Sequence, residues 1–315
     1  MKIRYIAAAD NYNFLREIIQ ALKAHDIHPF DYRTDSQLQP DITWFEWMDG
    51  LFLFMIQNAV KSPGSKWVAR LHRYEIYSPR VIQNIKKSEF AIRDKIDKFV
   101  FVSDYIRRKA ISMFPWMENS ITIPNLYDHR LFPCYPLLPV KERKHKDILF
   151  LGRRTYVKNI PLALQFFKEL CISDRGMEYN LFFVGSPGEP EVDDFIIWFV
   201  SKNNLSHRVH IFDQVQRNSL RQIMWNMDFI IATSYIESQG MGIIEGMSTG
   251  LRPLIYNFPG SDCHFRRDWI FNDVETFIRM IKEGNRTPEE YSRYAIDNFS
   301  IEKNIHRYDA LLKTI

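Results

Sequence analysis

The chain has 315 residues, of which 46% are apolar and 15% aromatic, and its formal net charge is +4. A chain this rich in large apolar side chains can bury a core, so disorder is excluded, and at this length two domains are expected rather than one. The three cysteines, Cys134, Cys171 and Cys263, are far apart and form no C-x-x-C pair, which argues against a disulfide framework and against a structural zinc site.

The N-terminal sequence and the basic clusters also limit the expected cellular location and binding partners. The N-terminal residues lead directly into a strand-like segment with no apolar run typical of a secretory signal, and residues 48–60 are too short and too polar to span a bilayer. We therefore expect a cytoplasmic protein. The basic clusters 86–87 and 107–109 indicate either a solvated helix face or a contact with anionic membrane lipid on the cytoplasmic side. No nucleic-acid partner is expected, because no helix-turn-helix, zinc-finger or RNP pattern is present.

Short apolar runs alternate with helical patterns in the first half of the chain. Strands are predicted at 2–8, 66–71 and 98–102, and helices at 14–24 and 104–113. This order is typical of a parallel sheet with helices on both faces. Residues 123–146 contain four prolines and then a charged run, which predicts a linker.

The same alternation restarts after the linker. Strands are predicted at 147–151, 179–184, 208–212, 228–232 and 253–256, separated by helices at 161–171, 192–203, 219–225 and 242–249. The sequence therefore predicts an α/β fold with two doubly wound, Rossmann-like domains, residues 1–140 and 141–300, facing each other across a cleft. Ligands of such sheets bind beyond the carboxyl ends of the strands.

A basic loop lies at one of these predicted strand ends. It runs from Gly152 to Lys158 and includes Arg153. Arginine offers a planar fork of donors and lysine a mobile charge, so the loop suits an anionic group. A basic surface loop is the equally supported alternative.

A pair of glutamates, Glu237 and Glu245, lies further along the chain, with Gly240 and Gly242 between them at the start of a predicted helix. Glycines at a helix start allow backbone N–H groups to approach a phosphate, whose charge the helix dipole favours. The carboxylates can accept hydrogen bonds from sugar hydroxyls. Taken without this context, Glu245 is an ordinary helix glutamate.

A single histidine, His72, follows a predicted strand of the first domain. Its position at the carboxyl end faces the expected cleft, so a functional role and a structural role are about equally supported.

Together these motifs resemble the retaining glycosyltransferases of family 4, which have the GT-B fold. The resemblance rests on the Gly-Arg-x4-Lys loop, on the Glu-x7-Glu segment and on residues 246–253, 101–103 and 124–132, and it extends from about residue 66 to the C-terminus. It implies transfer of a hexose from a nucleoside diphosphate sugar, such as a UDP or GDP sugar, to an acceptor hydroxyl with retained configuration. The acceptor would be a glycan, a polysaccharide or a glycolipid precursor. A GT-B sugar-nucleotide epimerase and a non-catalytic, nucleotide-binding subunit remain alternatives.

The resemblance also implies residue roles on the donor side. Arg153 and Lys158 would hold the diphosphate, Glu237 the donor sugar and Glu245 the ribose. The remaining donor-binding positions implied are Gly152, Gly185, Ser186, Gly240, Met241 and Gly242.

On the acceptor side the resemblance implies that His72 lies near both the donor sugar and the acceptor. Asp10, Asn11 and Arg73 are candidate acceptor contacts, although Ala7 to Asn11 replaces the glycine-rich loop that many members have after the first strand. Residues 301–315 would form a helix that crosses back to the first domain. No cofactor and no metal are expected, in agreement with the lack of an Asp-x-Asp motif.

Overall fold

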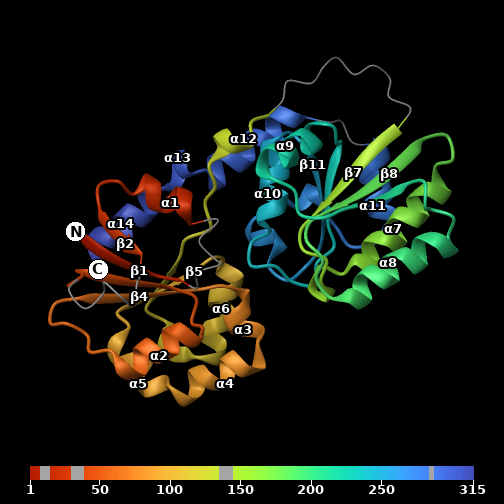
Figure 1. Ribbon diagram of the computed structural model, residues 1–315. Helices are drawn as coiled ribbons and strands as arrows, with labels where there is room; N and C mark the ends of the chain where they lie inside the picture. Colours follow the sequence, from red (N-terminus) through yellow and green to blue (C-terminus); the bar gives the residue numbers. More distant parts are fainter. Residues whose placement is uncertain (8–14, 30–38, 135–144, 284–286) are drawn as a thin grey trace. The chain divides into compact units, whose positions relative to one another are not determined.

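The computed structural model describes residues 1–7, 15–29, 39–134, 145–283 and 287–315. The chain divides into two compact units, which we call unit 1 (residues 1–127 and 299–315) and unit 2 (residues 128–298) (Figure 1). The predicted boundary between residues 140 and 141 lies outside the described residues and stays a prediction.

Unit 1 is built on a parallel sheet of six strands in the order β2-β1-β3-β4-β5-β6. The strands are β1 (Lys2–Ile6), β2 (Asp26–Pro29), β3 (Ile42–Glu46), β4 (Lys66–Leu71), β5 (Lys98–Phe101) and β6 (Ser120–Thr122). All five residues of β3 are buried, as expected of a central parallel strand that has helices on both of its faces.

Helices cover both faces of this sheet (Figure 1). One face packs against α2 (Gly50–Asn58), α3 (Arg73–Tyr77), α4 (Pro79–Lys87), α5 (Glu89–Lys95) and α6 (Asp104–Met113). The other face packs against α1 (Arg16–Ala21), α13 (Ile301–Asn304) and α14 (His306–Thr314). The apolar stretch near residue 50 is thus a helix within the unit, begun by Asp49, whose carboxylate accepts the backbone N–H of Phe52 at 3.0 Å.

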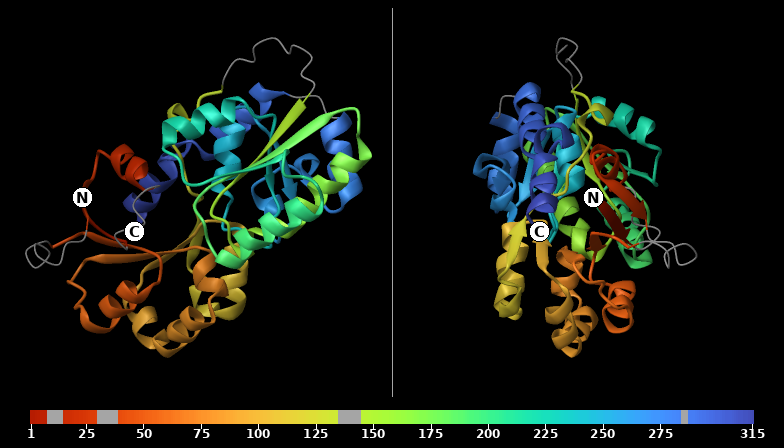
Figure 2. Two further views of the ribbon diagram at one scale, coloured as in Figure 1. Left: turned by 45° about the vertical axis from the view of Figure 1, so that its right-hand side comes forward. Right: turned by 90° about the vertical axis from the view of Figure 1, so that its left-hand side faces the viewer.

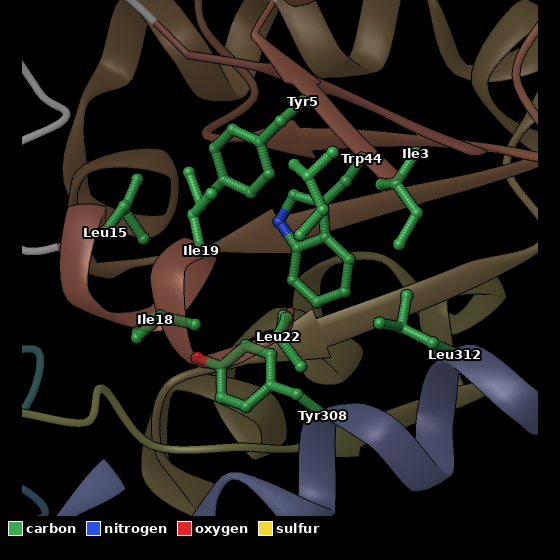
Figure 3. A pocket seen from close by; sticks show the side chains of 10 residues that line it. Ile3, Tyr5, Leu15, Ile18, Ile19, Leu22, Trp44, Tyr308 and Leu312 are labelled. Atoms are coloured by element: carbon green, nitrogen blue, oxygen red, sulfur yellow. The ribbon is translucent and has the colours of Figure 1, made fainter. Parts of the chain in front are cut away.

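The C-terminal residues are part of unit 1, and both ends of the chain lie in this unit (Figure 2). Tyr308, Leu311 and Leu312 of α14 are buried against the sheet. Between α14, α1 and the sheet lies an apolar cavity of about 20 Å³, lined by Tyr5, Trp44 and Tyr308 and by aliphatic side chains (Figure 3). The cavity is part of the packing between α1, α14 and the sheet.

Unit 2 repeats the plan with six parallel strands in the order β12-β11-β10-β7-β8-β9. The strands are β7 (His145–Leu151), β8 (Glu178–Val184), β9 (Val209–Phe212), β10 (Phe229–Ala232), β11 (Arg252–Tyr256) and β12 (Ile270–Phe271). The helices are α7 (Ile160–Ser173), α8 (Pro190–Lys202), α9 (Arg217–Trp225), α10 (Met241–Ser248), α11 (Val274–Glu283) and α12 (Pro288–Phe299).

The two faces of the unit 2 sheet are also covered. Ile148 and Phe150 of β7 point into a core shared with α7, α8 and α11, while α10 lies on the opposite face (Figure 1). There, Gly246 of α10 approaches Ile230 of β10 so closely that an added Cβ would lie 2.5 Å from its side chain.

The predicted fold class is therefore confirmed: the chain is an α/β protein with two Rossmann-like units. Within the described part of the chain, no helix combines the length and the apolar character needed to cross a membrane.

Candidate functional site

The carboxyl ends of β7 and β8 in unit 2 are joined by backbone contacts. The N–H of Gly152 donates to the carbonyl of Val184 at 3.0 Å, and the N–H of Arg154 donates to the carbonyl of Ser186 at 3.1 Å. Gly185, with φ of 150°, lies so close to the first loop that a Cβ would be 2.2 Å from the Gly152 carbonyl oxygen. Glycine is therefore required at residue 185 for the two loops to touch.

The two adjacent arginines of the basic loop have different environments. Arg154 is 3% exposed, and its guanidinium pairs with Asp193 at 2.5 Å and Asp213 at 2.9 Å. It also donates to the carbonyl of Gly185 at 2.5 Å, so it ties together the loops that follow β7, β8 and β9. Arg153 is exposed, with one bond from Nε to the carbonyl of Pro187 at 3.3 Å. Of the two, Arg153 has the side chain that can reach a ligand.

Lys158 and Glu237 meet at the next strand end, although they are far apart in sequence. The Lys158 ammonium lies 2.6 Å from Oε1 of Glu237, and the Ser234 hydroxyl donates to the same oxygen at 2.6 Å. The side chains are 26% and 13% exposed, respectively. The hydroxyl of Thr233 holds the backbone of this turn by donating to the Lys158 carbonyl at 3.1 Å. The ion pair is consequently part-buried but still accessible from solvent.

Helix α10 begins beside this pair. Gly240 precedes the helix in the left-handed region with φ of 88°, and an added Cβ on Gly242 would lie 3.3 Å from atoms of Leu151 at the end of β7. A small cavity of about 20 Å³ is bounded by Lys158, Glu237, Gly240 and Gly242. This volume holds about one water molecule. The first turn of α10 thus packs directly onto the strand end that carries the basic loop.

Unit 1 holds charges of another kind at the ends of β3 and β4. Glu46 and Arg70, which are register partners, are both fully buried and lie 2.9 Å apart. Burial would raise the pKa of Glu46, but the Arg70 charge and hydrogen bonds from His72 and Tyr5 outweigh it and lower this pKa to about 2. Arg70 also donates to Asn125 Oδ1 at 2.8 Å. These side chains form a closed ion pair inside the unit.

His72 lies next to this ion pair. Its Nε2 is 2.7 Å from Oε1 of Glu46, and His72 begins α3 in a capping box with Glu75. Trp47 stacks on the imidazole with 5.0 Å between ring centroids. Burial raises the pKa of the Glu75 carboxyl, whose oxygens accept the backbone N–H groups of His72 at 2.9 Å and Met48 at 3.0 Å.

The predicted site residues fall into three groups. In unit 2, Lys158, Glu237, Gly240 and Gly242 line one cavity. Close by in the chain fold are Gly152, Arg153, Gly185 and Ser186, while Met241 is the first residue of α10 and Glu245 is half-buried on the same helix. His72 and Arg73 lie together in unit 1, where Arg73 opens α3. Asp10 and Asn11 lie outside the described residues.

The sequence motifs do not point to Glu46 or Arg154, nor to the ion-pair role of Arg70. The sequence does contain a signal for the ion pair of Glu46 and Arg70. The two residues are opposite charges inside successive apolar runs, ITWFE and KWVARL. A charge inside a strand that is buried on both faces needs a partner. No comparable signal separates Arg154 from Arg153.

The described residues contain no cluster of three or more His, Cys, Asp or Glu side chains placed to hold a metal ion.

Comparisons with known proteins bear on both units. Residues 139–270 match the family model described as glycosyl transferases group 1. No curated protein matches the chain.

Solved structures match over the full length. The HepE protein of Anabaena in complex with UDP and glucose has a TM-score of 0.78 at 15% identity, covering 100% of both chains. A glycosyltransferase from Rickettsia africae has a TM-score of 0.76 at 15% identity and covers 99% of this chain and 97% of its own. Sucrose-phosphate synthase from Thermosynechococcus elongatus has a TM-score of 0.76 at 14% identity, covering 99% and 98%. The chain therefore has the GT-B fold of these glycosyltransferases, and over residues 139–270 it matches glycosyl transferases group 1.

Proposed function

We propose that this chain is a retaining glycosyltransferase that moves a hexose from a nucleoside diphosphate sugar to an acceptor hydroxyl. The observation that carries the proposal is the contact of Lys158 with Glu237 beside the glycine-opened start of α10, within the segment that matches the family model. A cation and a carboxylate that are partly exposed and next to a helix N-terminus can bind different parts of one sugar nucleotide. The cation and the helix take the phosphates, and the carboxylate takes sugar hydroxyls.

The barrier of such a transfer lies in breaking the bond between the sugar and the phosphate. Negative charge grows on the leaving diphosphate, and Lys158, Arg153 and the first-turn amides of α10 are the groups we assign to stabilise it. Donors that are fixed before the reaction cost little reorganisation, and removing one commonly costs about 3–4 kcal/mol.

Glu237 is assigned to orient the donor sugar rather than to attack it. Its Oε1 is engaged by the Lys158 ammonium and the Ser234 hydroxyl. In the proposed reaction the bond from C1 to the phosphate oxygen breaks, and a bond from C1 to the acceptor oxygen forms on the same face of the sugar. The acceptor proton passes to the leaving phosphate, so no separate general base is needed.

UDP-glucose is the first donor to test, because the HepE structures contain UDP, UDP with glucose, and UDP-glucose. We further propose that no metal is required, since Lys158 and Arg153 supply positive charge where a metal would otherwise do so. An assay in the presence of EDTA checks this, and a loss of activity that Mg²⁺ or Mn²⁺ restores would contradict it.

The deciding experiment compares two lysine variants at saturating donor. Lys158→Ala is expected to lower kcat by about 10²–10³, as expected for loss of one charge-stabilising donor. Lys202→Ala is the matched control, because Lys202 is an exposed lysine at the end of α8, and it should leave kcat unchanged. Undiminished transfer by the purified Lys158→Ala protein would overturn the diphosphate assignment.

The donor and the stereochemistry are tested separately. A thermal-shift panel of UDP, GDP and ADP sugars should raise the unfolding midpoint with the true donor, because a ligand of the native state stabilises it. Proton NMR of the product should show the same anomeric configuration as in the donor. Conversion of the donor alone to a new sugar nucleotide, visible by NMR, would instead support an epimerase. Nucleotide binding without turnover would support a non-catalytic subunit.

A further inference from the structure

We infer that Glu46 is a positioning residue which, together with the backbone amide of Glu75, holds His72 as the neutral tautomer protonated on Nε2. His72 therefore transfers no proton in the reaction proposed above. The kinetic part of this inference rests on the proposed function, whereas the tautomer itself does not. The imidazole ring of His72 has three contacts, one at each nitrogen and one at a face.

The first contact is at Nε2. It lies 2.7 Å from Oε1 of Glu46, and the Glu46 side chain is fully buried. A carboxylate only accepts hydrogen bonds while it is ionised, and the pKa of Glu46, lowered to about 2, keeps it ionised at neutral pH. The proton in this contact consequently resides on Nε2.

The second contact is at the other nitrogen. His72 is the first residue of a capping box in which its side chain accepts the backbone N–H of Glu75, while the Glu75 carboxylate accepts the backbone N–H of His72. Because Nε2 faces Glu46, the accepting atom is Nδ1, which must keep its lone pair. Protonation of Nδ1 would set two N–H donors against each other in a buried place, and an unsatisfied buried donor costs about 1–3 kcal/mol.

The third contact fixes the plane of the ring. Trp47 lies 26° from parallel to the imidazole, with 5.0 Å between centroids. Its backbone has φ of 72°, a rare conformation for a bulky residue, and its N–H donates to the carbonyl of Arg70 at 3.0 Å. Strained residues of this kind persist where the surroundings over-determine them. The indole thus blocks rotation of the imidazole away from Glu46.

Glu46 can serve this purpose because its other bonds hold it rigidly. Oε1 also pairs with Arg70, and Oε2 accepts from the Tyr5 hydroxyl at 2.6 Å and from the Trp44 indole at 2.9 Å. Among the described residues, the titratable groups that face this cluster are Tyr5 of β1, Arg70 of β4, Glu75 of α3 and Tyr308 of α14.

Glu46 already has a counter-ion among the described residues, so its charge is compensated without a cation on His72. Burial raises the pKa values of Tyr5, Tyr308 and Glu75, so the two phenols stay neutral at physiological pH. Arg70, whose pKa stays raised because the charge of Glu46 outweighs burial, is the permanent counter-ion of Glu46. An imidazolium is not needed to compensate the Glu46 charge.

The tautomer can be read by NMR of the full-length protein with ¹⁵N-labelled histidine, where His72→Asn assigns the signals. The expected wild-type result is a pyridine-type Nδ1, a pyrrole-type Nε2 and a slowly exchanging Nε2–H. A doubly protonated ring, or a proton on Nδ1, would overturn the inference. This experiment decides the matter even if the protein has no transferase activity.

Two variants separate Glu46 from the general stability of the cluster. Glu46→Asp keeps the charge opposite Arg70 but is shorter by one methylene, so the slow Nε2–H signal should be lost. Tyr5→Phe removes a different bond to the same carboxylate and should retain the signal. An Nε2–H signal that is equally protected in Glu46→Asp would refute the role of Glu46.

Kinetics test the absence of proton transfer. His72→Asn retains a good helix cap, and we expect kcat/KM to fall by less than about tenfold, with the shape of its pH profile unchanged, because general acid–base groups contribute 10²–10⁴. A loss of that size, together with the disappearance of an ionisation from the pH profile, would show that His72 does transfer a proton. Inactivity of the wild type would instead count against the proposed function and leave the NMR result standing.

Discussion

The two units share one fold plan but differ in how deeply they bury the ion pair at the carboxyl ends of their strands. In unit 1 the ion pair of Glu46 and Arg70 is fully buried, and every oxygen of the carboxylate is bonded within the unit. In unit 2 the ion pair of Lys158 and Glu237 is partly exposed. Both pairs are short, at 2.9 and 2.6 Å, so distance does not distinguish them.

Access to solvent is the difference that matters. When one member of a buried ion pair is removed, the other is left as an uncompensated charge in a low-dielectric interior. We therefore expect the buried pair to matter for stability. A partly exposed pair can exchange its mutual contact for contacts with a ligand at small cost. The comparison therefore predicts that substitutions in unit 1 change stability, whereas those at Lys158 and Glu237 change activity.

The largest expected effect is on the stability of unit 1. Arg70→Met removes the partner of the buried Glu46 carboxylate and should lower the free energy of unfolding by about 3–5 kcal/mol. Urea titration, with hydrogen exchange of the β3 and β4 amides, measures the loss.

The double variant Glu46→Leu with Arg70→Met serves as its control. Removing both charges should recover part of the stability lost in the single variant, because no buried charge is left unpaired. A double variant as unstable as the sum of the two single ones would show that the pair is not coupled.

A somewhat smaller effect should appear on acidification. The pKa of Glu46 is lowered from 4.5 to about 2 in the fold, so the stability that it contributes is present above pH 4.5 and is lost as the pH falls toward 2. The loss is smaller than with Arg70→Met, since a protonated carboxyl keeps its packing and can still accept a hydrogen bond. Acid titration followed by hydrogen exchange should show the β3 and β4 amides of unit 1 opening in this range, and retained protection at pH 2 would contradict it.

The next effect concerns the contact between the loops after β7 and β8. Gly185→Ala should destabilise unit 2 by about 1–3 kcal/mol and weaken donor binding, because its Cβ would overlap the Gly152 carbonyl. Gly176→Ala is the matched control, since the nearest atom to its added Cβ is 3.8 Å away. Equal midpoints for the two variants in thermal unfolding would mean that the loops can separate freely.

The smallest effect is expected at the unit 2 ion pair itself. A double-mutant cycle with Lys158→Met and Glu237→Gln should give a coupling free energy of about 1 kcal/mol or less for unfolding, because the pair is partly solvated. Urea midpoints of the four proteins measure this coupling. A coupling free energy as large as that of the Glu46–Arg70 pair would contradict the proposed difference between the two ion pairs.

Most of the fold follows from local pattern. The runs at residues 147–151, 179–184 and 228–232 become the strands β7, β8 and β10, because short apolar runs flanked by glycine or polar residues favour buried parallel strands. Four strands have no counterpart among the predicted ones: β2, β6, β12 and β3, the strand that carries Glu46. Strand β3 is a five-residue apolar run that ends in a glutamate, and a run this short does not separate a buried strand from a buried helix segment.

The candidate site is less predictable for a related reason. Lys158 and Glu237 were singled out, and the structure places them in contact, but their roles stay predictions. Arg153 and Arg154 differ because only Arg154 pairs with Asp193 and Asp213. This difference follows from the packing of three separate strand ends, which the local sequence does not show. The contacts of His72 depend likewise on the pairing of β3 with β4, which brings Glu46 beside Arg70 and His72.

The position of α14 also has a consequence for synthesis in the cell. Tyr308, Leu311 and Leu312 complete the core of unit 1, yet the ribosome makes them after all of unit 2. At roughly 5–20 residues per second, the apolar face of β1 and β3 waits on the order of ten seconds or more for its cover. Unit 2 can therefore complete its core before unit 1 does. The uncovered face of the unit 1 sheet is the part of the nascent chain on which we expect a chaperone to act.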